Sequence, residues 1–223
     1  MSRVIKAEEG EIYDIELAED LLKANESLAE ENKKLFSKHG VKVIDVMGSV
    51  GTGKTALVEQ MVQKLKGKYR IAAIAGDLTT TIDADRIARH GVDVIQINTG
   101  KECHLDANLV RKALRKIDLN KIDLLIIENV GNLICPAEFH LGSDKRVVVI
   151  SLTEGPNMVV KHPYTFMEAD VVVINKMDLA DALEADVDKL VRDARQVNPK
   201  AKIVKISCKN GTGIMEVIKA LEL

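Results

Sequence analysis

Seven short runs rich in β-branched residues alternate with more polar stretches from residue 41 onward, and this alternation constrains the fold more than any other feature. Several runs are apolar on both sides, as strands of a parallel sheet covered on both faces must be. They predict strands at 41–47, 70–75, 92–97, 122–127, 146–151, 169–174 and 201–206. Helical patterns lie between most of them, at about 54–67, 82–90, 104–116, 182–195 and 213–221. We therefore expect an α/β fold with a doubly wound, mostly parallel sheet of about seven strands.

The first 40 residues have a different pattern. Apolar side chains recur at steps of three and four within 12–39, which is typical of an amphipathic helix, and Gly40 is suited to end it. We expect an N-terminal helical arm at 1–40 and one domain at 41–223. The arm either covers the main domain, which we favour, or contacts a partner or a second subunit. Its apolar stripe, interrupted by Glu31, consists of Leu17, Leu21, Ala24, Leu28 and Leu35.

Composition excludes several classes of function. The chain of 223 residues has a formal net charge of −2 and only 3% aromatic residues, so it lacks the basic surface and the stacking side chains that nucleic acids require. No apolar run approaches the roughly 20 residues of a membrane-spanning helix. The acidic first segment does not resemble a signal peptide, and three irregularly spaced cysteines indicate reduced thiols. We expect a cytoplasmic protein that binds neither nucleic acid nor a membrane.

A phosphate-binding loop follows the first expected strand. Residues 48–55 read GSVGTGKT, which fits the pattern G-x-x-x-x-G-K-[ST] between a strand and a helix and indicates a P-loop NTPase. Backbone N–H groups of such a loop surround the phosphates. Lys54 would reach the β- and γ-phosphates and assist catalysis, and the Thr55 hydroxyl would ligate Mg²⁺. The expected nucleotide contacts are Gly48, Ser49, Val50, Gly51, Thr52, Gly53, Lys54 and Thr55.

Two later strand ends favour guanine over adenine. The sequence Asn175-Lys176-Met177-Asp178 follows the sixth expected strand. The carboxylate of Asp178 can accept hydrogen bonds from N1–H and the 2-amino group of guanine, whereas adenine would leave it unpaired. A backbone N–H of the segment after the seventh strand could meet guanine O6. The expected base contacts are Asn175, Lys176, Asp178, Ser207, Cys208 and Lys209.

Acidic residues at two other strand ends are candidates for magnesium binding and hydrolysis. Asp77 and Glu128 are expected to bind Mg²⁺ directly or through water, and Gly131 to sense the γ-phosphate. Asp83 either orients the attacking water as a catalytic residue or only caps a helix. No Gln follows Gly131 to orient water, so we expect slow intrinsic hydrolysis of GTP to GDP and phosphate.

Cysteine and histidine side chains suggest a second metal site. Cys103 and His104 are adjacent after the third expected strand, and Cys135 lies shortly after Gly131. Thiolate and imidazole ligands suit Zn²⁺ or Ni²⁺. Both segments belong to the carboxyl ends of strands, where ligands of such sheets bind. Three ligands would leave one coordination position for water, exchange or a second subunit. The alternative is that these residues only fill space.

Several motifs together resemble a known family. The segments GSVGTGKT, GDLTTTIDADR, GKECHLDA, ENVGNLICP, TEGPNMVVKHP and NKMD occur in this order over about residues 41–223. They resemble the HypB family of hydrogenase nickel-incorporation GTPases, which is grouped with UreG among the P-loop metallochaperone GTPases. The Cys-His pair followed by a later Cys-Pro makes the resemblance specific.

The resemblance implies a function. A member of this family is a GTP-hydrolysing metallochaperone with Mg²⁺ at the nucleotide and Ni²⁺ or Zn²⁺ at a subunit interface, here on Cys103, His104 and Cys135. A GTP-dependent homodimer would gate nickel transfer to the large subunit of [NiFe]-hydrogenase, with a HypA-like nickel protein as partner. Lys161 matches a lysine that approaches the nucleotide across the dimer.

One departure and three alternatives remain. Residues 1–38 contain neither His nor Cys, so we expect no nickel-storage tract and no tight N-terminal nickel site there. A urease-type nickel GTPase would carry Cys-Pro-His, whereas Ala137 follows Pro136 here. A GTP-binding regulatory switch would need no metal role for the cysteines. A G-protein chaperone of a cobalamin enzyme would not need the Cys-His pair.

Overall fold

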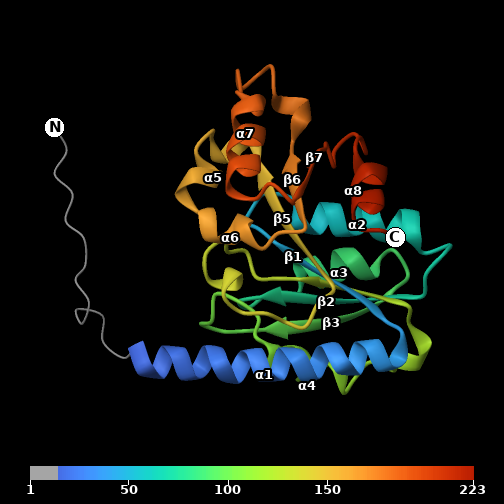
Figure 1. Ribbon diagram of the computed structural model, residues 1–223. Coiled ribbons are helices and arrows are strands. Elements are labelled where there is room, and N and C mark those ends of the chain that lie inside the picture. The colour runs from blue at the N-terminus through green and yellow to red at the C-terminus, as the bar shows by residue number, and fades with distance from the viewer. Residues whose placement is uncertain (1–14) are drawn as a thin grey trace.

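The computed structural model describes residues 15–223, with side chains from residue 19 onward, and contains one seven-stranded sheet (Figure 1). The strand order is β3-β2-β4-β1-β5-β6-β7, and every neighbouring pair is parallel. This confirms the doubly wound fold and all seven predicted strands. The strands are β1 (Lys42–Met47), β2 (Ile71–Asp77), β3 (Asp93–Asn98), β4 (Leu124–Glu128), β5 (Lys145–Ser151), β6 (Val171–Asn175) and β7 (Lys202–Lys205).

Helices cover both faces of the sheet, which explains why the central strands are buried throughout. One face packs against α2 (Lys54–Leu65), α3 (Ile82–Ala88) and α8 (Ile214–Ala220). The other face packs against α1 (Ile15–His39) and α4 (Ala107–Leu114) at one side. Its remaining half lies under α5 (Met158–Lys161), α6 (Pro163–Met167) and α7 (Val187–Val197). Short 3₁₀ helices are η1 (Leu119–Lys121), η2 (Cys135–Ala137), η3 (Leu152–Glu154) and η4 (Met177–Leu179).

The N-terminal helix is present, but its apolar stripe was assigned to the wrong face. Leu21 is 57% exposed and Ala24 is also exposed, while Leu28 and Leu35 are partly buried. The side chain of Leu17 lies outside the described part of the chain. The buried face contains Ala29 and Phe36 together with two asparagines. The asparagines are buried because they bond to backbone groups: Asn25 Nδ2 donates to His140 O at 2.9 Å and Asn32 Nδ2 to Ala107 O at 2.9 Å. Apolar periodicity cannot reveal such a half-polar packing surface.

The helix expected at 104–116 begins later, at Ala107. Asp106 is its N-cap, and the Asp106 carboxylate accepts a hydrogen bond from the Leu109 N–H at 2.6 Å. His104 therefore lies in the loop between β3 and α4 rather than on a helix. In this loop the imidazole of His104 lies close to Cys135, in the loop that follows β4 at the same edge of the sheet.

No helix within residues 15–223 has both the length and the apolar character needed to span a lipid bilayer.

Candidate nucleotide and metal sites

The P-loop forms one wall of a cavity of about 350 Å³ at the carboxyl ends of β1, β2 and β4. Lys54 opens α2 and is buried, and its ammonium donates to Ser49 O at 3.2 Å. Burial lowers the pKa of Lys54, while the carboxylates of Glu128 and Asp83 oppose that shift. The cavity is lined by Val50, Gly51, Gly53, Lys54, Thr55, Ala56, Gly76, Asp77, Asp83, Arg86, Glu128, Asn129 and Gly131.

Two carboxylates converge on the hydroxyl of Thr55 inside this cavity. Thr55 Oγ1 lies 2.7 Å from Glu128 Oε1 and 2.8 Å from Asp83 Oδ1. A hydroxyl has one proton, so it can donate to only one of them. Glu128 Oε2 is buried and has no hydrogen-bond partner within the described residues. Burial raises the pKa of Glu128 to about 7, with the Thr55 hydrogen bond and Lys54 opposing. Burial therefore outweighs the stabilisation that Thr55 and Lys54 give the ionised carboxylate of Glu128.

These residues fit Mg²⁺ well. A hard divalent cation prefers carboxylate and hydroxyl oxygens, and it would satisfy the two carboxylates that the single Thr55 proton cannot. The alternative that Asp83 caps a helix is wrong, because Thr81 is the N-cap of α3 and Asp83 lies within its first turn. Asp77 lines the same cavity, but its Oδ1 already accepts the N–H groups of Thr79 and Thr80 at 3.0 and 2.7 Å.

A second cavity of about 460 Å³ adjoins the first, and the two share Gly53 and Ala56 in their linings. Asn175 shapes it without needing a ligand. Its Nδ2 donates to Thr52 O at 2.8 Å, and its Oδ1 accepts the N–H groups of Lys176 at 2.7 Å and Cys208 at 3.1 Å. The lining residues are Gly53, Ala56, Asn175, Lys176, Asp178, Leu179, Cys208 and Lys209. All the expected base contacts except Ser207 therefore line one cavity.

Asp178 is held at the edge of this second cavity by its neighbour. Ser207 Oγ donates to Asp178 Oδ1 at 2.6 Å, and this hydrogen bond holds the pKa of Asp178 below its usual range. The carboxylate is thus ionised and exposed, ready to accept hydrogen bonds from a ligand. Lys176 Nζ donates to the Thr153 hydroxyl at 2.9 Å. Burial raises the pKa of the Cys208 thiol to about 11, and the Cys208 N–H donates to Asn175 Oδ1.

Lys161 ends α5 and is exposed. It lines neither cavity, and neither do four other expected nucleotide contacts, which are Gly48, Ser49, Thr52 and Ser207. A contact between Lys161 and a nucleotide of the same chain finds no support in these linings.

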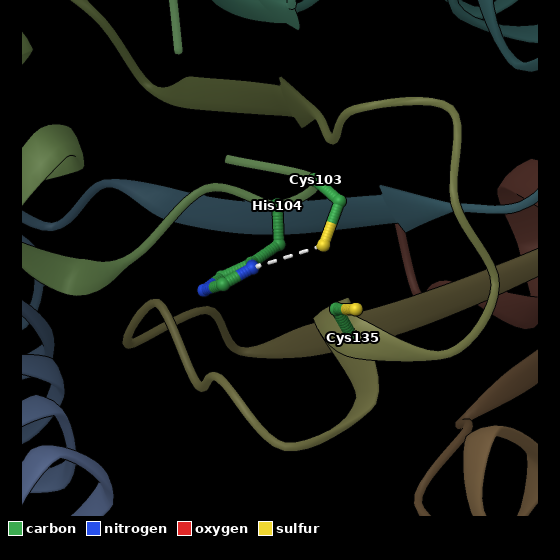
Figure 2. Close-up of side chains that lie close together, drawn as sticks. All are labelled: Cys103, His104 and Cys135. Atoms are coloured by element: carbon green, nitrogen blue, oxygen red, sulfur yellow. Dashed lines mark hydrogen bonds between the residues drawn. The ribbon is translucent and has the colours of Figure 1, made fainter. Parts of the chain in front are cut away.

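Cys103, His104 and Cys135 come together on two neighbouring loops, as Figure 2 shows. One ligand atom from each lies within 4.8 Å of the other two, and all three side chains are partly buried. Cys103 Sγ lies 3.8 Å from His104 Nδ1. Cys135 begins η2, where Pro136 fixes the first turn. Among the described residues, this is the one group of three or more Cys, His and acidic side chains with such a geometry.

The chemistry of the three side chains suits a borderline-soft cation. Contact with the Cys135 thiol and burial raise the pKa of the Cys103 thiol. Burial lowers the pKa of His104, so its imidazole is neutral and has a free electron pair. The His104 ring lies on Phe139, with 3.9 Å between ring centroids. Two thiols and one neutral imidazole fit Zn²⁺ or Ni²⁺, which would replace the thiol protons.

The loop that carries Cys135 and the cavity of about 350 Å³ at the P-loop, which we call the phosphate cavity, share one segment of chain. Residues 128–135 run from Glu128, at the phosphate cavity, past Gly131 to Cys135. Asn132 forms an antiparallel bridge with Gly48 of the P-loop. A Cβ on Gly131 would lie 2.5 Å from Val50 Cγ2, so the segment contacts the P-loop too closely for a side chain there.

The sequence analysis did not single out two residues around these sites. Asn129 lines the phosphate cavity and is fully buried, and Arg146 is buried on β5 behind the metal loops. Asn129 could have been found from the sequence, because it is adjacent to Glu128 in the ENVG segment at the end of a predicted strand. Arg146 opens an apolar run and resembles an ordinary exposed end of a strand, so nothing in the sequence marks it.

The comparisons with known proteins agree on one family. The CobW/HypB/UreG nucleotide-binding domain matches residues 42–205. The chain is 53% identical over 208 residues to the probable hydrogenase maturation factor HypB of Methanocaldococcus jannaschii, covering 93% of this chain and 94% of that protein. Its fold matches the crystal structure of the hydrogenase maturation factor HypB from Archaeoglobus fulgidus, with a TM-score of 0.84 and 44% identity, covering 90% of this chain and 98% of that one.

A further similar solved structure is a nickel complex. HypB from Helicobacter pylori in complex with nickel matches with a TM-score of 0.84 and 36% identity, covering 89% of this chain and 94% of that chain. The family match spans most of the chain, and the identity to the M. jannaschii protein extends over nearly its whole length. The chain therefore belongs to the CobW/HypB/UreG family, and within it to the HypB hydrogenase maturation factors.

Proposed function

We propose that this protein is a GTP-hydrolysing metallochaperone that binds Ni²⁺ or Zn²⁺ and couples its GTP cycle to nickel insertion during [NiFe]-hydrogenase maturation. The observation that carries the proposal is the cluster of Cys103, His104 and Cys135, whose ligand atoms lie within 4.8 Å of one another. The segment 128–135 connects this cluster to the phosphate cavity, so metal and nucleotide act on the same piece of chain.

The nucleotide proposed for the two cavities is GTP. The ionised and exposed Asp178, fixed by Ser207, supports recognition of guanine because it can accept hydrogen bonds from N1–H and the 2-amino group. Lys54 would bind the β- and γ-phosphates, and Thr55, Glu128 and Asp77 would hold Mg²⁺, directly or through water, with the Asp83 carboxylate beside them. Mg²⁺, when bound, neutralises the phosphate charge that develops during hydrolysis. Asp83 remains our candidate to orient the attacking water, and we expect slow turnover.

The metal at the cysteine site is cargo rather than a resident cofactor. Three ligands from one chain leave a coordination position open, which allows release or completion by another subunit. Large apolar side chains are exposed around the site: Val50 in the P-loop is 81% exposed and Ile134 beside Cys135 is 62% exposed. Their exposure supports a GTP-dependent homodimer formed over this face.

Three further parts of the proposal follow from the family. Exposed Lys161 would reach the nucleotide of the second subunit. A HypA-like nickel protein would supply or receive the metal, and the hydrogenase large subunit would be the client. The absence of His and Cys from residues 1–38 agrees with metal handling at the G-domain site. The proposed location is the cytoplasm.

The test is metal binding by the reduced protein. We expect one Ni²⁺ or Zn²⁺ per metal site in the wild type, and loss of most of the bound metal in Cys103→Ala and in Cys135→Ala. Cys208→Ala is the matched control, because it also removes a thiol. That thiol is buried and lines the second cavity, which contains Asp178, rather than the metal site. GTP and ATP hydrolysis are measured on the same samples. A wild type that hydrolyses GTP but binds no metal would instead support a GTP-binding switch without a metal role.

A further inference from the structure

A buried polar cluster lies beneath the metal site and is not explained by nucleotide or metal binding. It consists of Asp45 on β1, Arg146 on β5 and Asn129 just after β4. Asp45 and Asn129 are completely buried, and Arg146 is 5% exposed. Interior charges are costly to desolvate, and apolar side chains of similar size would pack there at no such cost. We call these three residues the clamp.

The clamp is anchored in the rigid part of the sheet. Asp45 and Arg146 are register partners on the adjacent strands β1 and β5. Arg146 Nε lies 3.6 Å from Asp45 Oδ2, and Asn129 Nδ2 donates to Asp45 Oδ1 at 3.3 Å. Asp45 therefore hydrogen-bonds to Asn129 and forms an ion pair with Arg146, although within the described residues its Oδ2 accepts no hydrogen bond. Their remaining polar atoms point to the loops above.

Arg146 bonds to the loop that carries Cys135. Its Nη1 donates to Ala137 O at 3.0 Å, and its Nη2 donates to Phe139 O at 3.4 Å. The Phe139 ring in turn lies on the imidazole of His104. The planar guanidinium can reach both carbonyls at once, which a lysine ammonium cannot do in the same geometry.

Asn129 bonds to the loop that carries Cys103 and His104. Its Oδ1 accepts the N–H of Leu105 at 3.0 Å and its own neighbour Val130 N–H at 3.0 Å. Leu105 directly follows His104 and is fully buried. Asn129 also lines the phosphate cavity beside Glu128. One residue thus bonds to the loop of Cys103 and His104 through its side chain and also lines the nucleotide cavity.

We propose that the clamp positions both loops of the metal site, and that Asn129 transmits the nucleotide state to the loop of Cys103 and His104. Arg146 positions the loop of Cys135 and the Phe139 ring that lies on His104. Asn129 connects the metal site to the phosphate cavity, whereas Arg146 only holds its loop in place. These are positioning residues, and their assignment rests on the proposed function because it requires that the cysteine site binds metal.

The experiment compares Arg146→Lys and Asn129→Ala with the wild type. Arg146→Lys keeps the charge beside Asp45 but loses one carbonyl contact, and Asn129→Ala frees Leu105 N–H. We expect Zn²⁺ affinity, measured by competition with a chelator, to fall about 10–100-fold in both. The absorption bands of bound Co²⁺ should shift, because they report the geometry of the ligands. In the wild type, Zn²⁺ affinity should differ between the GDP-bound protein and the protein bound to a non-hydrolysable GTP analogue. Asn129→Ala should abolish this difference in Zn²⁺ affinity, whereas Arg146→Lys should retain it.

Asn198→Ala is the matched control. Asn198 is buried and donates to three backbone carbonyls, those of Phe166, Met167 and Ala169, outside both metal loops. Its loss should lower the free energy of unfolding but leave Zn²⁺ affinity and the Co²⁺ spectrum unchanged. Thermal unfolding shows which variants fold. In the wild type, the Leu105 amide should exchange with solvent more slowly once Zn²⁺ is bound.

The outcomes separate the two proposals. If Cys103→Ala loses the metal while folded Arg146→Lys and Asn129→Ala bind Zn²⁺ like the wild type, the clamp is refuted and the metallochaperone reading stands. A wild type that binds no metal refutes both. If neither variant folds, unchanged exchange of the Leu105 amide on Zn²⁺ binding refutes the clamp, and slower exchange supports it.

Discussion

The hydroxyl of Thr55 lies 2.7 Å from a carboxylate oxygen of Glu128, at the point where the P-loop meets the end of β4. The second oxygen of Glu128 is buried without a hydrogen-bond partner in the part of the chain described. This pair places a P-loop hydroxyl and an under-stabilised carboxylate where a cation would satisfy both. It also fixes the start of the segment that leads to Cys135.

Asp83 should matter for hydrolysis because its carboxylate reaches the same hydroxyl at 2.8 Å. Asp83→Asn should lower kcat for GTP hydrolysis on the order of 100-fold, whether Asp83 binds Mg²⁺ or orients water. Asp85→Asn is the control, since Asp85 is exposed on the same helix and accepts a hydrogen bond from Thr81. Phosphate release measured over a range of Mg²⁺ concentrations tests this. Equal rates for the two variants would remove Asp83 from the mechanism.

Asp178 should determine which purine binds. In Asp178→Asn the amide can donate to the 2-oxo group of xanthine but cannot accept from guanine as a carboxylate does. We expect weaker GDP binding, by about 100-fold or more, and a preference that moves toward xanthosine nucleotides. Competition binding with the two nucleotides measures it. Asp181→Asn, an exposed acid of the following turn, should behave like the wild type. Unchanged selectivity in Asp178→Asn would contradict the assignment of the base cavity.

Asp45 should make the stability of the metal-free protein depend on pH. Burial raises the pKa of Asp45 from 3.8 to about 6, although Arg146 and Asn129 oppose the shift. The folded state therefore binds this proton more tightly than the unfolded state does, so its contribution is present below pH 3.8 and is lost as pH rises to about 6. As pH rises over this range, the free energy of unfolding of the wild type should fall by on the order of 3 kcal/mol relative to that of Asp45→Asn, which cannot ionise. Urea unfolding of both proteins at several pH values provides the comparison, and a constant difference would contradict it.

Gly53 should tolerate no side chain. A Cβ there would lie 2.3 Å from Asn175 Nδ2, and its φ of +99° is unfavourable for other residues. Gly53→Ala should therefore disturb Asn175 and weaken nucleotide binding by at least tenfold. Gly51→Ala is the matched comparison: Gly51 also has a positive φ, of +80°, but nothing lies within 4 Å of its Cβ position. If Gly51→Ala weakens binding as much as Gly53→Ala, backbone strain rather than the contact with Asn175 is responsible.

The sheet was predictable from sequence because its strands are continuous apolar runs that need no long-range information. The P-loop and the Asn175–Asp178 segment were recognisable because their chemistry lies in consecutive residues. Helices α5 and α6 were missed, since each has at most five residues and lacks a full amphipathic period. The clustering of Cys103 with Cys135 was expected because both follow strand ends and because the family resemblance implies a metal site there.

Contacts between residues far apart in the chain could not be predicted. Asn25 and Asn32 interrupt no apolar pattern, yet they anchor α1 through backbone groups more than 70 positions away. Arg146 has no sequence signature, because its role depends on lying beside Asp45 on the adjacent strand. Asp83 was ambiguous for the same reason, since only the fold brings it to Thr55.

The most direct test of the central claim is the Ni²⁺ affinity of the reduced protein with GDP and with a non-hydrolysable GTP analogue, read together with its mass in solution. The account predicts that exchanging the nucleotide changes the Ni²⁺ affinity at Cys103, His104 and Cys135, and that the GTP analogue favours the dimer. Identical Ni²⁺ affinity and identical mass in the two nucleotide states would contradict it.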